Sequence, residues 1–148
     1  MIILEELNVD NWLETMELSV SEEQKNVFPI PNVYWVGISR YEEKTTLYAI
    51  KNDETVVGLI GIGYDEDGVS GYINPLMIDE KYQGNGYSKA AVKSAIEKLK
   101  NDYKVSEIHI GHRKTNAVAG KLYESLGFVI FDEDETDYFR SLDLNQVR

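Results

Sequence analysis

The sequence has 148 residues, no cysteine and a formal net charge of −11 at pH 7. This length suits one domain, residues 1–148, that buries a core without cross-links. The absence of cysteine excludes disulfides, thiolate metal sites and a cysteine nucleophile. The acidic charge disfavours nucleic acid as a partner and favours cationic small molecules, although most single carboxylates are interpreted as solvated surface charge.

The amino-terminal part has neither a basic segment nor a long apolar run, so we expect no signal peptide, no membrane span and a cytoplasmic protein. A first strand is predicted over residues 2–7. A helix then begins near Asn11, because Trp12, Met16 and Val20 recur at helical spacing. A second short helix is predicted from Asn32 to about residue 40.

Strands and two further helices follow. Asn52-Asp53 and residues 65–68 are turn signals between apolar runs, and Gly127 is predicted to cap the carboxy-terminal end of a helix. The clearest helix carries an apolar stripe that includes Ala91, Val92 and Leu99. Strands are predicted over residues 46–51, 55–64, 69–78, 107–112, 128–131 and 138–144, and helices over residues 87–100 and 117–125.

The order of these elements predicts an α/β (α+β) domain. A run of hairpins joins a later β-α-β crossover, so we expect a central, mixed, mostly antiparallel sheet flanked by helices. Pro75 cannot donate a ladder hydrogen bond, which predicts a bulge or an edge near Asn74-Pro75. His109 and His112 should point to opposite faces of their strand.

A glycine-rich segment, residues 82–89, joins a predicted strand to a predicted helix. Gly84 and Gly86 permit a tight turn, and the free N–H groups of the first helical turn favour an anion such as pyrophosphate. The dinucleotide fingerprint is not met, because Lys89 stands where its third glycine would be. On spacing alone, both glycines are equally well explained as simple turn residues.

Two segments resemble motifs of the GNAT superfamily of N-acetyltransferases. Residues 77–89 resemble its acetyl-coenzyme A motif, with Gln83 and Gly86 matching and Ser88 replacing the last small residue. Residues 116–128 resemble its later motif, from Asn116 through Leu-Tyr-Glu to Leu-Gly-Phe. Two motifs in the right order imply the fold of that superfamily along nearly the whole chain.

The resemblance implies how acetyl-coenzyme A is bound. The strand end would pair its backbone with the pantetheine arm, and the glycine loop would hold the pyrophosphate. Lys89 either adds charge toward a phosphate or is a solvated helix lysine, and Asn116 either contacts pantetheine, caps its helix, or does both. The implied coenzyme-binding residues are Leu76, Met77, Ile78, Gln83, Gly84, Asn85, Gly86, Tyr87, Ser88, Lys89 and Asn116.

The resemblance also implies the chemistry, in which an amine attacks the thioester directly. Tyr123 is the predicted catalytic residue, since a phenol near the sulfur can protonate the departing thiolate. A backbone N–H near Met77 would stabilise the oxyanion. The alternative is that Tyr123 is a core aromatic residue. We expect no metal, and the sequence singles out no general base among His109, His112 and their neighbours.

The acceptor is the least constrained part of the prediction. The amino-terminal half resembles bacterial spermine/spermidine acetyltransferases, which implies a polyamine; Glu22 and Glu23 would then bind the cation, unless they are ordinary surface charges. Another small amine, a protein amino terminus, or a non-catalytic acetyl-coenzyme A sensor are the alternatives. Homodimers are common in the superfamily, so a homodimer is also compatible with the resemblance.

Overall fold

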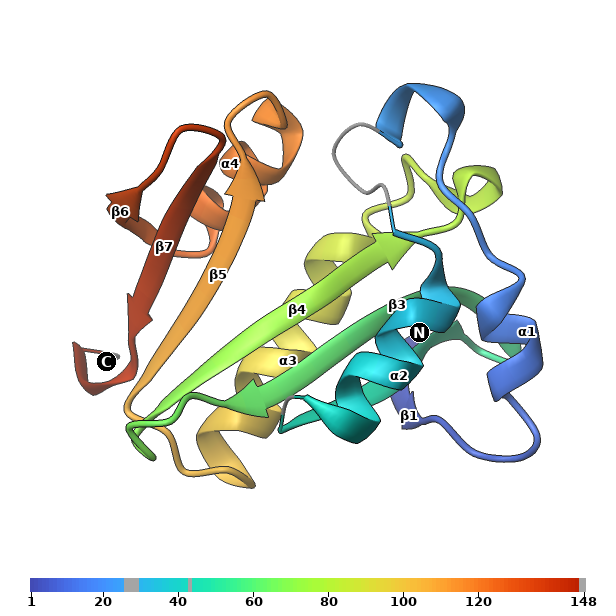
Figure 1. The fold of residues 1–148 in the computed structure, drawn as a ribbon, viewed down its shortest axis with the longest axis horizontal. Helices are drawn as coiled ribbons and strands as arrows, with labels where there is room; N and C mark the ends of the chain where they lie inside the picture. The colour runs from blue at the N-terminus through green and yellow to red at the C-terminus, as the bar shows by residue number, and fades with distance from the viewer. Residues whose placement is uncertain (26–29, 43, 147–148) are drawn as a thin grey trace.

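A seven-stranded sheet with the order β1-β2-β3-β4-β5-β7-β6 organises the computed structural model, which describes residues 1–25, 30–42 and 44–146 (Figure 1). All recorded strand pairs are antiparallel except β4 with β5, so the predicted mixed sheet is confirmed. The strands are β1 Ile2–Glu6, β2 Thr45–Asn52, β3 Thr55–Tyr64, β4 Ser70–Ile78, β5 Glu107–Arg113, β6 Val129–Glu133 and β7 Asp137–Asp143.

Helices cover both faces of the sheet (Figure 1). The predicted order of helices and strands is confirmed, and only the bounds shift by a few residues. Within the described residues, no helix is both long and apolar enough to cross a membrane. The helices are α1 Trp12–Met16, α2 Asn32–Tyr41, α3 Tyr87–Asn101 and α4 Ala117–Ser125, with 3-10 turns η1 Glu22–Gln24, η2 Glu80–Tyr82 and η3 Leu144–Gln146.

The first helix is shorter than the sequence pattern predicts, because it ends at Met16 and leaves Val20 outside it. Two hydrogen bonds from distant side chains end it. Asn32 Nδ2 donates to the carbonyl of Thr15 (2.9 Å), and the N–H of Ser19 donates to Asp79 Oδ2 (3.0 Å). If the helix continued, the N–H of Ser19 would donate to the carbonyl of Thr15. Both groups already have other hydrogen-bond partners, so the helix ends before this bond.

The main core lies between the sheet and the helices α3 and α4. The predicted stripe of α3 is buried, since Ala91, Val92 and Leu99 are each 0% exposed. Tyr123 of α4 and Phe128 after it belong to the same cluster. A smaller cluster under α2 covers the other side. Helix and strand periodicities agree with these two layers, so the sheet is covered by apolar side chains on both faces.

Strands β4 and β5 form a fork. Their parallel pairing is recorded only from Ser70↔Glu107 to Tyr72↔His109, near the start of both strands. Beyond these pairs the two strands diverge (Figure 1). The diverging parts leave room between the two halves of the sheet.

A bulge in β4 lies at the fork. Ile62 of β3 is opposite Ile73, whereas Ile60 is opposite Leu76, so β4 carries an extra residue around Asn74-Pro75. The bulge predicted from Pro75 is therefore confirmed. Because Pro75 has no N–H to donate, the regular ladder cannot continue through it.

Candidate active site

The glycine loop between η2 and α3 has open space around it. Gly84 (φ +82°) and Gly86 (φ +77°) adopt left-handed backbone conformations, and a Cβ built on either would meet nothing within 4 Å. Gly86 immediately precedes α3, whose first N–H groups have no acceptor within the helix. The loop therefore places backbone N–H groups at the positive end of a helix dipole, where an anion can approach.

Side chains of this segment brace the loop. Gln83 Nε2 donates to the carbonyl of Ile78 (2.8 Å) and to Gln24 Oε1 (2.7 Å), which ties the loop to the end of β4 and to η1. The Tyr87 hydroxyl accepts a hydrogen bond from Asn52 Nδ2 (3.0 Å). These side chains hold the loop in place and leave its backbone available, as the predicted binding through backbone groups requires.

Apart from Asn116, the remaining predicted coenzyme-binding residues lie at the end of β4, in the loop and in the first turn of α3. Of the strand-end residues, Met77 and Ile78 are buried and Leu76 is half-buried. In the first turn of α3, Ser88 is half-buried, and Lys89 is exposed, as is Asn85 of the loop. The structure thus brings the end of β4 and the loop together beside the fork.

Helix α4 begins on the other arm of the fork, after β5. Asn116 Oδ1 accepts a hydrogen bond from the N–H of Ala119 (3.2 Å), so the predicted capping role of Asn116 is confirmed. Gly127 (φ +98°) follows the carboxy-terminal cap residue, as predicted. Both ends of this helix are therefore fixed.

Tyr123 lies on the buried side of α4 and is 5% exposed. Its ring packs against the rings of His112 (centroid distance 5.7 Å) and Phe128 (6.0 Å). Burial raises the pKa of the Tyr123 phenol above its usual range. A tyrosine phenol of ordinary pKa, about 10, already keeps its proton at neutral pH, and burial strengthens that preference.

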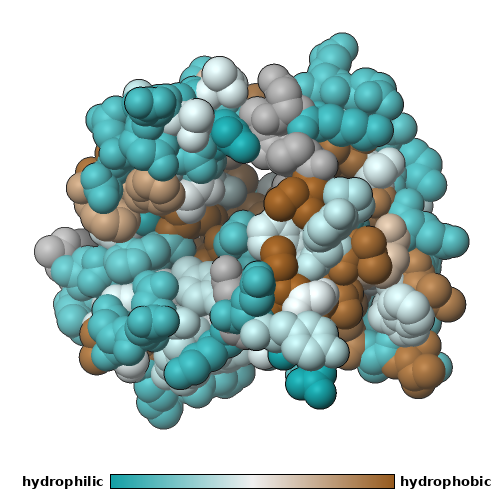
Figure 2. Space-filling view, viewed as in Figure 1, coloured by the Kyte–Doolittle hydropathy of each residue, from teal (hydrophilic) through white to brown (hydrophobic). Residues whose placement is uncertain are grey.

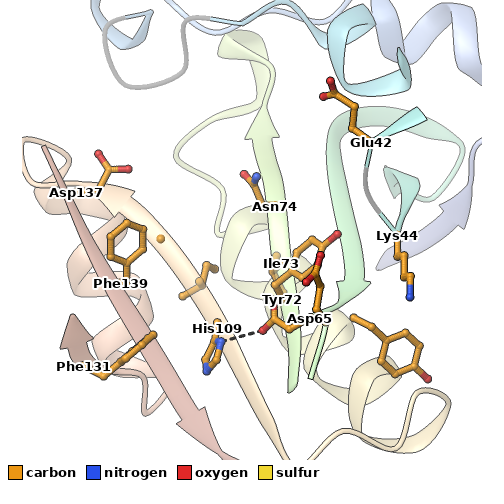
Figure 3. Close-up of a pocket in the computed structure, with 14 residues that line it drawn as sticks. Glu42, Lys44, Asp65, Tyr72, Ile73, Asn74, His109, Phe131, Asp137 and Phe139 are labelled. Atoms are coloured by element: carbon orange, nitrogen blue, oxygen red, sulfur yellow. Dashed lines mark hydrogen bonds and ion pairs between the residues drawn. The ribbon is translucent and has the colours of Figure 1, made fainter. Parts of the chain in front are cut away.

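A cleft of about 690 Å³ opens on the α2 face at the fork. Figure 2 shows this hollow between the two halves of the molecule, with hydrophobic side chains inside it and hydrophilic ones around it. In Figure 3, β4 supplies one wall and the residues of β5, β6 and β7 supply the other. Its lining comprises Glu42, Lys44, Tyr64, Asp65, Glu66, Tyr72, Ile73, Asn74, His109, Ile110, Gly111, Phe131, Asp137 and Phe139.

The cleft is acidic, since Glu42, Asp65, Glu66 and Asp137 outnumber its described basic residues, Lys44 and His109. Excess negative charge in a concave, partly apolar site raises the local concentration of cations.

His109 occupies one end of the cleft between two carboxylates. Its Nδ1 lies 2.9 Å from Asp65 Oδ2, drawn dashed in Figure 3, and its Nε2 lies 3.1 Å from Glu107 Oε2. The ring of Phe131 packs against the imidazole at 4.9 Å. Burial raises the pKa of the Asp65 carboxyl above its usual range, although His109 partly offsets that effect.

The two histidines face opposite sides of β5, as predicted. His109 lines the cleft, whereas His112 is buried against α4. The predicted acceptor residues Glu22 and Glu23 lie elsewhere, exposed on η1, where Glu22 pairs with Lys25 (2.9 Å). Among the described residues, neither glutamate lines the cleft.

Sequence reasoning missed most of the cleft. Asp137 and Phe139 lie opposite Arg113 and Gly111 in the β5–β7 register, on the face that also carries His109. The strand alternation contains this signal, but the pairing of β5 with β7 has to be known before it can be used. In the described part of the chain, no group of three or more His, Asp or Glu side chains is arranged to hold a metal ion.

Residues 8–128 match the Acetyltransferase (GNAT) family, and the chain belongs to it. It is thus an N-acetyltransferase of a family in which binding of acetyl-coenzyme A is typical. It is 30% identical over 125 residues to a spermine/spermidine N(1)-acetyltransferase of Bacillus subtilis, covering 80% of this chain and 82% of that one.

Solved structures share the fold at lower identity. A spermidine N-acetyltransferase from Vibrio cholerae, in complex with CoA and spermine, superposes with a TM-score of 0.80 at 13% identity, covering 98% of this chain and 96% of that one. The ribosomal-protein-S18-alanine N-acetyltransferase from Escherichia coli has a TM-score of 0.74 at 18% identity, covering 97% and 94%. Because both are below 25% identity, they show the fold alone.

Proposed function

We propose that this enzyme transfers the acetyl group of acetyl-coenzyme A to a primary amine of a polyamine such as spermine or spermidine. The observation that carries the proposal is the acidic cleft at the fork, lined in part by β4, the strand that leads into a glycine loop open to an anion. A polycation fits a cleft in which carboxylates outnumber basic side chains. The spermine/spermidine N(1)-acetyltransferase relative supports the same acceptor.

Acetyl-coenzyme A would lie along the fork. The backbone of the loop would hold the pyrophosphate, and the end of β4 would pair with the pantetheine arm, where no pairing with β5 is recorded. Asn116 would contact the pantetheine through its amide group while its oxygen caps α4. The proposed contacts are Leu76, Met77, Ile78, Gln83, Gly84, Asn85, Gly86, Tyr87, Ser88, Lys89 and Asn116.

The proposed chemistry is direct transfer. The amine nitrogen attacks the thioester carbonyl, and a backbone N–H near Met77 stabilises the oxyanion that forms. The carbon–sulfur bond then breaks, and the thiolate takes a proton from the Tyr123 phenol. The attacking ammonium loses one proton to solvent before attack. The nitrogen of the tetrahedral intermediate loses a second proton, and the Tyr123 phenolate regains one from solvent, so the products are the amide, the free thiol and one proton.

The acceptor would enter through the cleft with its amine directed toward the fork. The carboxylates Glu42, Asp65, Glu66 and Asp137 would attract its remaining positive charges. Glu22 and Glu23 remain a second proposed contact for the acceptor. They lie on the exposed turn η1, whose Gln24 accepts a hydrogen bond from Gln83 of the glycine loop.

The first experiment measures release of coenzyme A from acetyl-coenzyme A over a panel of spermine, spermidine, putrescine, lysine, an aminoglycoside and a peptide with a free amino terminus. Selective turnover of spermine or spermidine supports the proposal. Turnover of another amine alone keeps the mechanism but refutes the polyamine acceptor. Binding of acetyl-coenzyme A without turnover of any amine refutes catalysis on these acceptors and favours a sensor.

The variant Tyr123→Phe tests the proposed proton donor. We expect kcat to fall by about 10²-fold, the lower end of what general acid catalysis contributes, while the Kd of acetyl-coenzyme A is kept. A variant that turns over like the wild type would show that the phenol is not the acid.

A further inference from the structure

Arg140 of β7 is a charged side chain inside the protein. Its residue is only 9% exposed. Among the described residues, no carboxylate forms an ion pair with it, although nine other ion pairs are recorded there. Burying a guanidinium costs several kcal/mol unless its donors are satisfied, so an arginine at this position is unexpected on grounds of packing alone.

Arg140 contacts three different segments. Its Nε donates to His112 Nε2 of β5 (3.0 Å), and its Nη1 donates to the carbonyl of Phe128 after α4 (3.4 Å). Helix α4 lies against Arg140 at Gly120. A Cβ added to Gly120 would lie 3.4 Å from Arg140 Nη2 and 3.2 Å from His112 Cε1. The guanidinium thus joins β5, α4 and the segment after α4.

All three segments surround Tyr123. The rings of His112 and Phe128 pack against its ring, at centroid distances of 5.7 Å and 6.0 Å. Gly120 lies three residues before Tyr123 on the same buried side of α4. Arg140 therefore fixes the walls of the pocket that holds Tyr123.

The Arg140 bond also fixes the His112 ring. Because His112 Nε2 accepts from Arg140, it carries no hydrogen. His112 Nδ1 then donates to the carbonyl of Arg113 (2.8 Å). Both ring nitrogens are occupied in one tautomer, so the imidazole has one preferred orientation against Tyr123.

We propose that Arg140 and His112 are positioning residues that orient the Tyr123 phenol for proton donation. The inference rests on the proposed role of Tyr123. An apolar side chain of similar volume fills the same space, but it cannot hold the imidazole or the Phe128 carbonyl in a fixed direction. A buried polar group can lower stability and still specify a single geometry of the groups around it.

A double-mutant cycle tests the proposal. We expect Arg140→Met to lower kcat about tenfold while the KM of acetyl-coenzyme A changes less than about twofold, since a 1 Å misplacement alone can cost up to about 10²-fold. Arg140→Lys keeps a donor and should recover part of kcat. In a Tyr123→Phe background, Arg140→Met should change kcat less than about twofold, because the group that it positions is gone.

The charge-matched control is Lys100→Met, on the exposed end of α3. Thermal unfolding of every variant separates loss of fold from loss of orientation. If Arg140→Met does not fold, Gly120→Ala takes its place, because its Cβ would lie 3.2 Å from His112 Cε1, a contact tight enough to shift the ring. We expect the same fall in kcat and the same loss of effect in the Tyr123→Phe background.

The outcomes separate the two proposals. An equal fall in kcat with and without the Tyr123 hydroxyl overturns the positioning role but keeps the proton donor. An unchanged kcat in Tyr123→Phe itself overturns both. If no amine is turned over, the flip rate of the ¹³C-labelled Tyr123 ring decides: faster flipping in Arg140→Met supports positioning, and an unchanged rate refutes it.

Discussion

The variant Gly61→Ala tests the packing that shapes the fork. Gly61 lies in β3 opposite the bulge of β4. A Cβ at this position would collide with the carbonyl oxygen of Asn74 and would come within 2.8 Å of Pro75 Cδ and of Thr45 Cγ2. Two of these atoms belong to the bulge, so the methyl group can be accommodated only if the bulge moves.

Overpacking of this kind typically costs about 1–3 kcal/mol. For a chain of this size, about 2–4 °C of melting temperature is lost per kcal/mol, so we expect a decrease of roughly 2–12 °C. Urea unfolding gives the same quantity as a lower midpoint at an unchanged slope. Turnover should fall as well, because the bulge belongs to the strand that forms one arm of the fork.

The matched control is Gly37→Ala in α2, where a Cβ would meet nothing within 4 Å. Here the same substitution should stabilise the protein by about 0.5–1 kcal/mol, because alanine suits a helix interior better than glycine. If Gly61→Ala is as stable as the wild type while Gly37→Ala shows the expected gain, the bulge does not restrict the space beside Gly61.

Three further predictions concern the ligands and pH. Gly86→Val should weaken acetyl-coenzyme A binding more than tenfold in a protein with unchanged circular dichroism, and retained affinity by calorimetry would remove the loop from the coenzyme site. The KM of spermidine should rise with salt if the cleft carboxylates steer it; a flat response contradicts that steering. The raised pKa of Asp65 means that its charge opposes folding once pH rises above the ordinary aspartate value of about 3.9. Asp65→Asn should therefore raise the melting temperature at pH 7, with a gain that shrinks as pH falls toward 4, whereas Glu54→Gln should not; a melting temperature below the wild type at pH 7 would contradict this.

The fold was predictable because its signals are local. The turn signals between apolar runs, the apolar stripe of α3 and the effect of Pro75 depend on residues near one another in sequence. The early end of α1 was not predictable, because Asn32 and Asp79 end it from positions 17 and 60 residues away from their partners. No periodicity within the helix contains that information.

The candidate site likewise has parts that depend on local signals and parts that depend on long-range ones. The glycine loop and α4 lie on continuous segments, so their motifs point to them directly. The cleft instead brings together Asp65 of a hairpin, His109 of β5 and Asp137 of β7. The position of Glu22 and Glu23 between the first helices predicts an acceptor role for them, but the described cleft is lined by other carboxylates. Long-range strand pairing decides which charges share a surface, and one sequence does not fix that pairing.

The short pairing of β4 with β5 also affects how the protein opens. The backbone ladder between the two halves of the sheet consists of three recorded residue pairs, so it is the narrowest junction in the sheet. Amide hydrogen exchange at residues 70–72 would report separation of the halves as one cooperative opening. A molecule that contacts both arms of the fork would slow that exchange and raise the unfolding temperature together, because it binds only while the junction is closed.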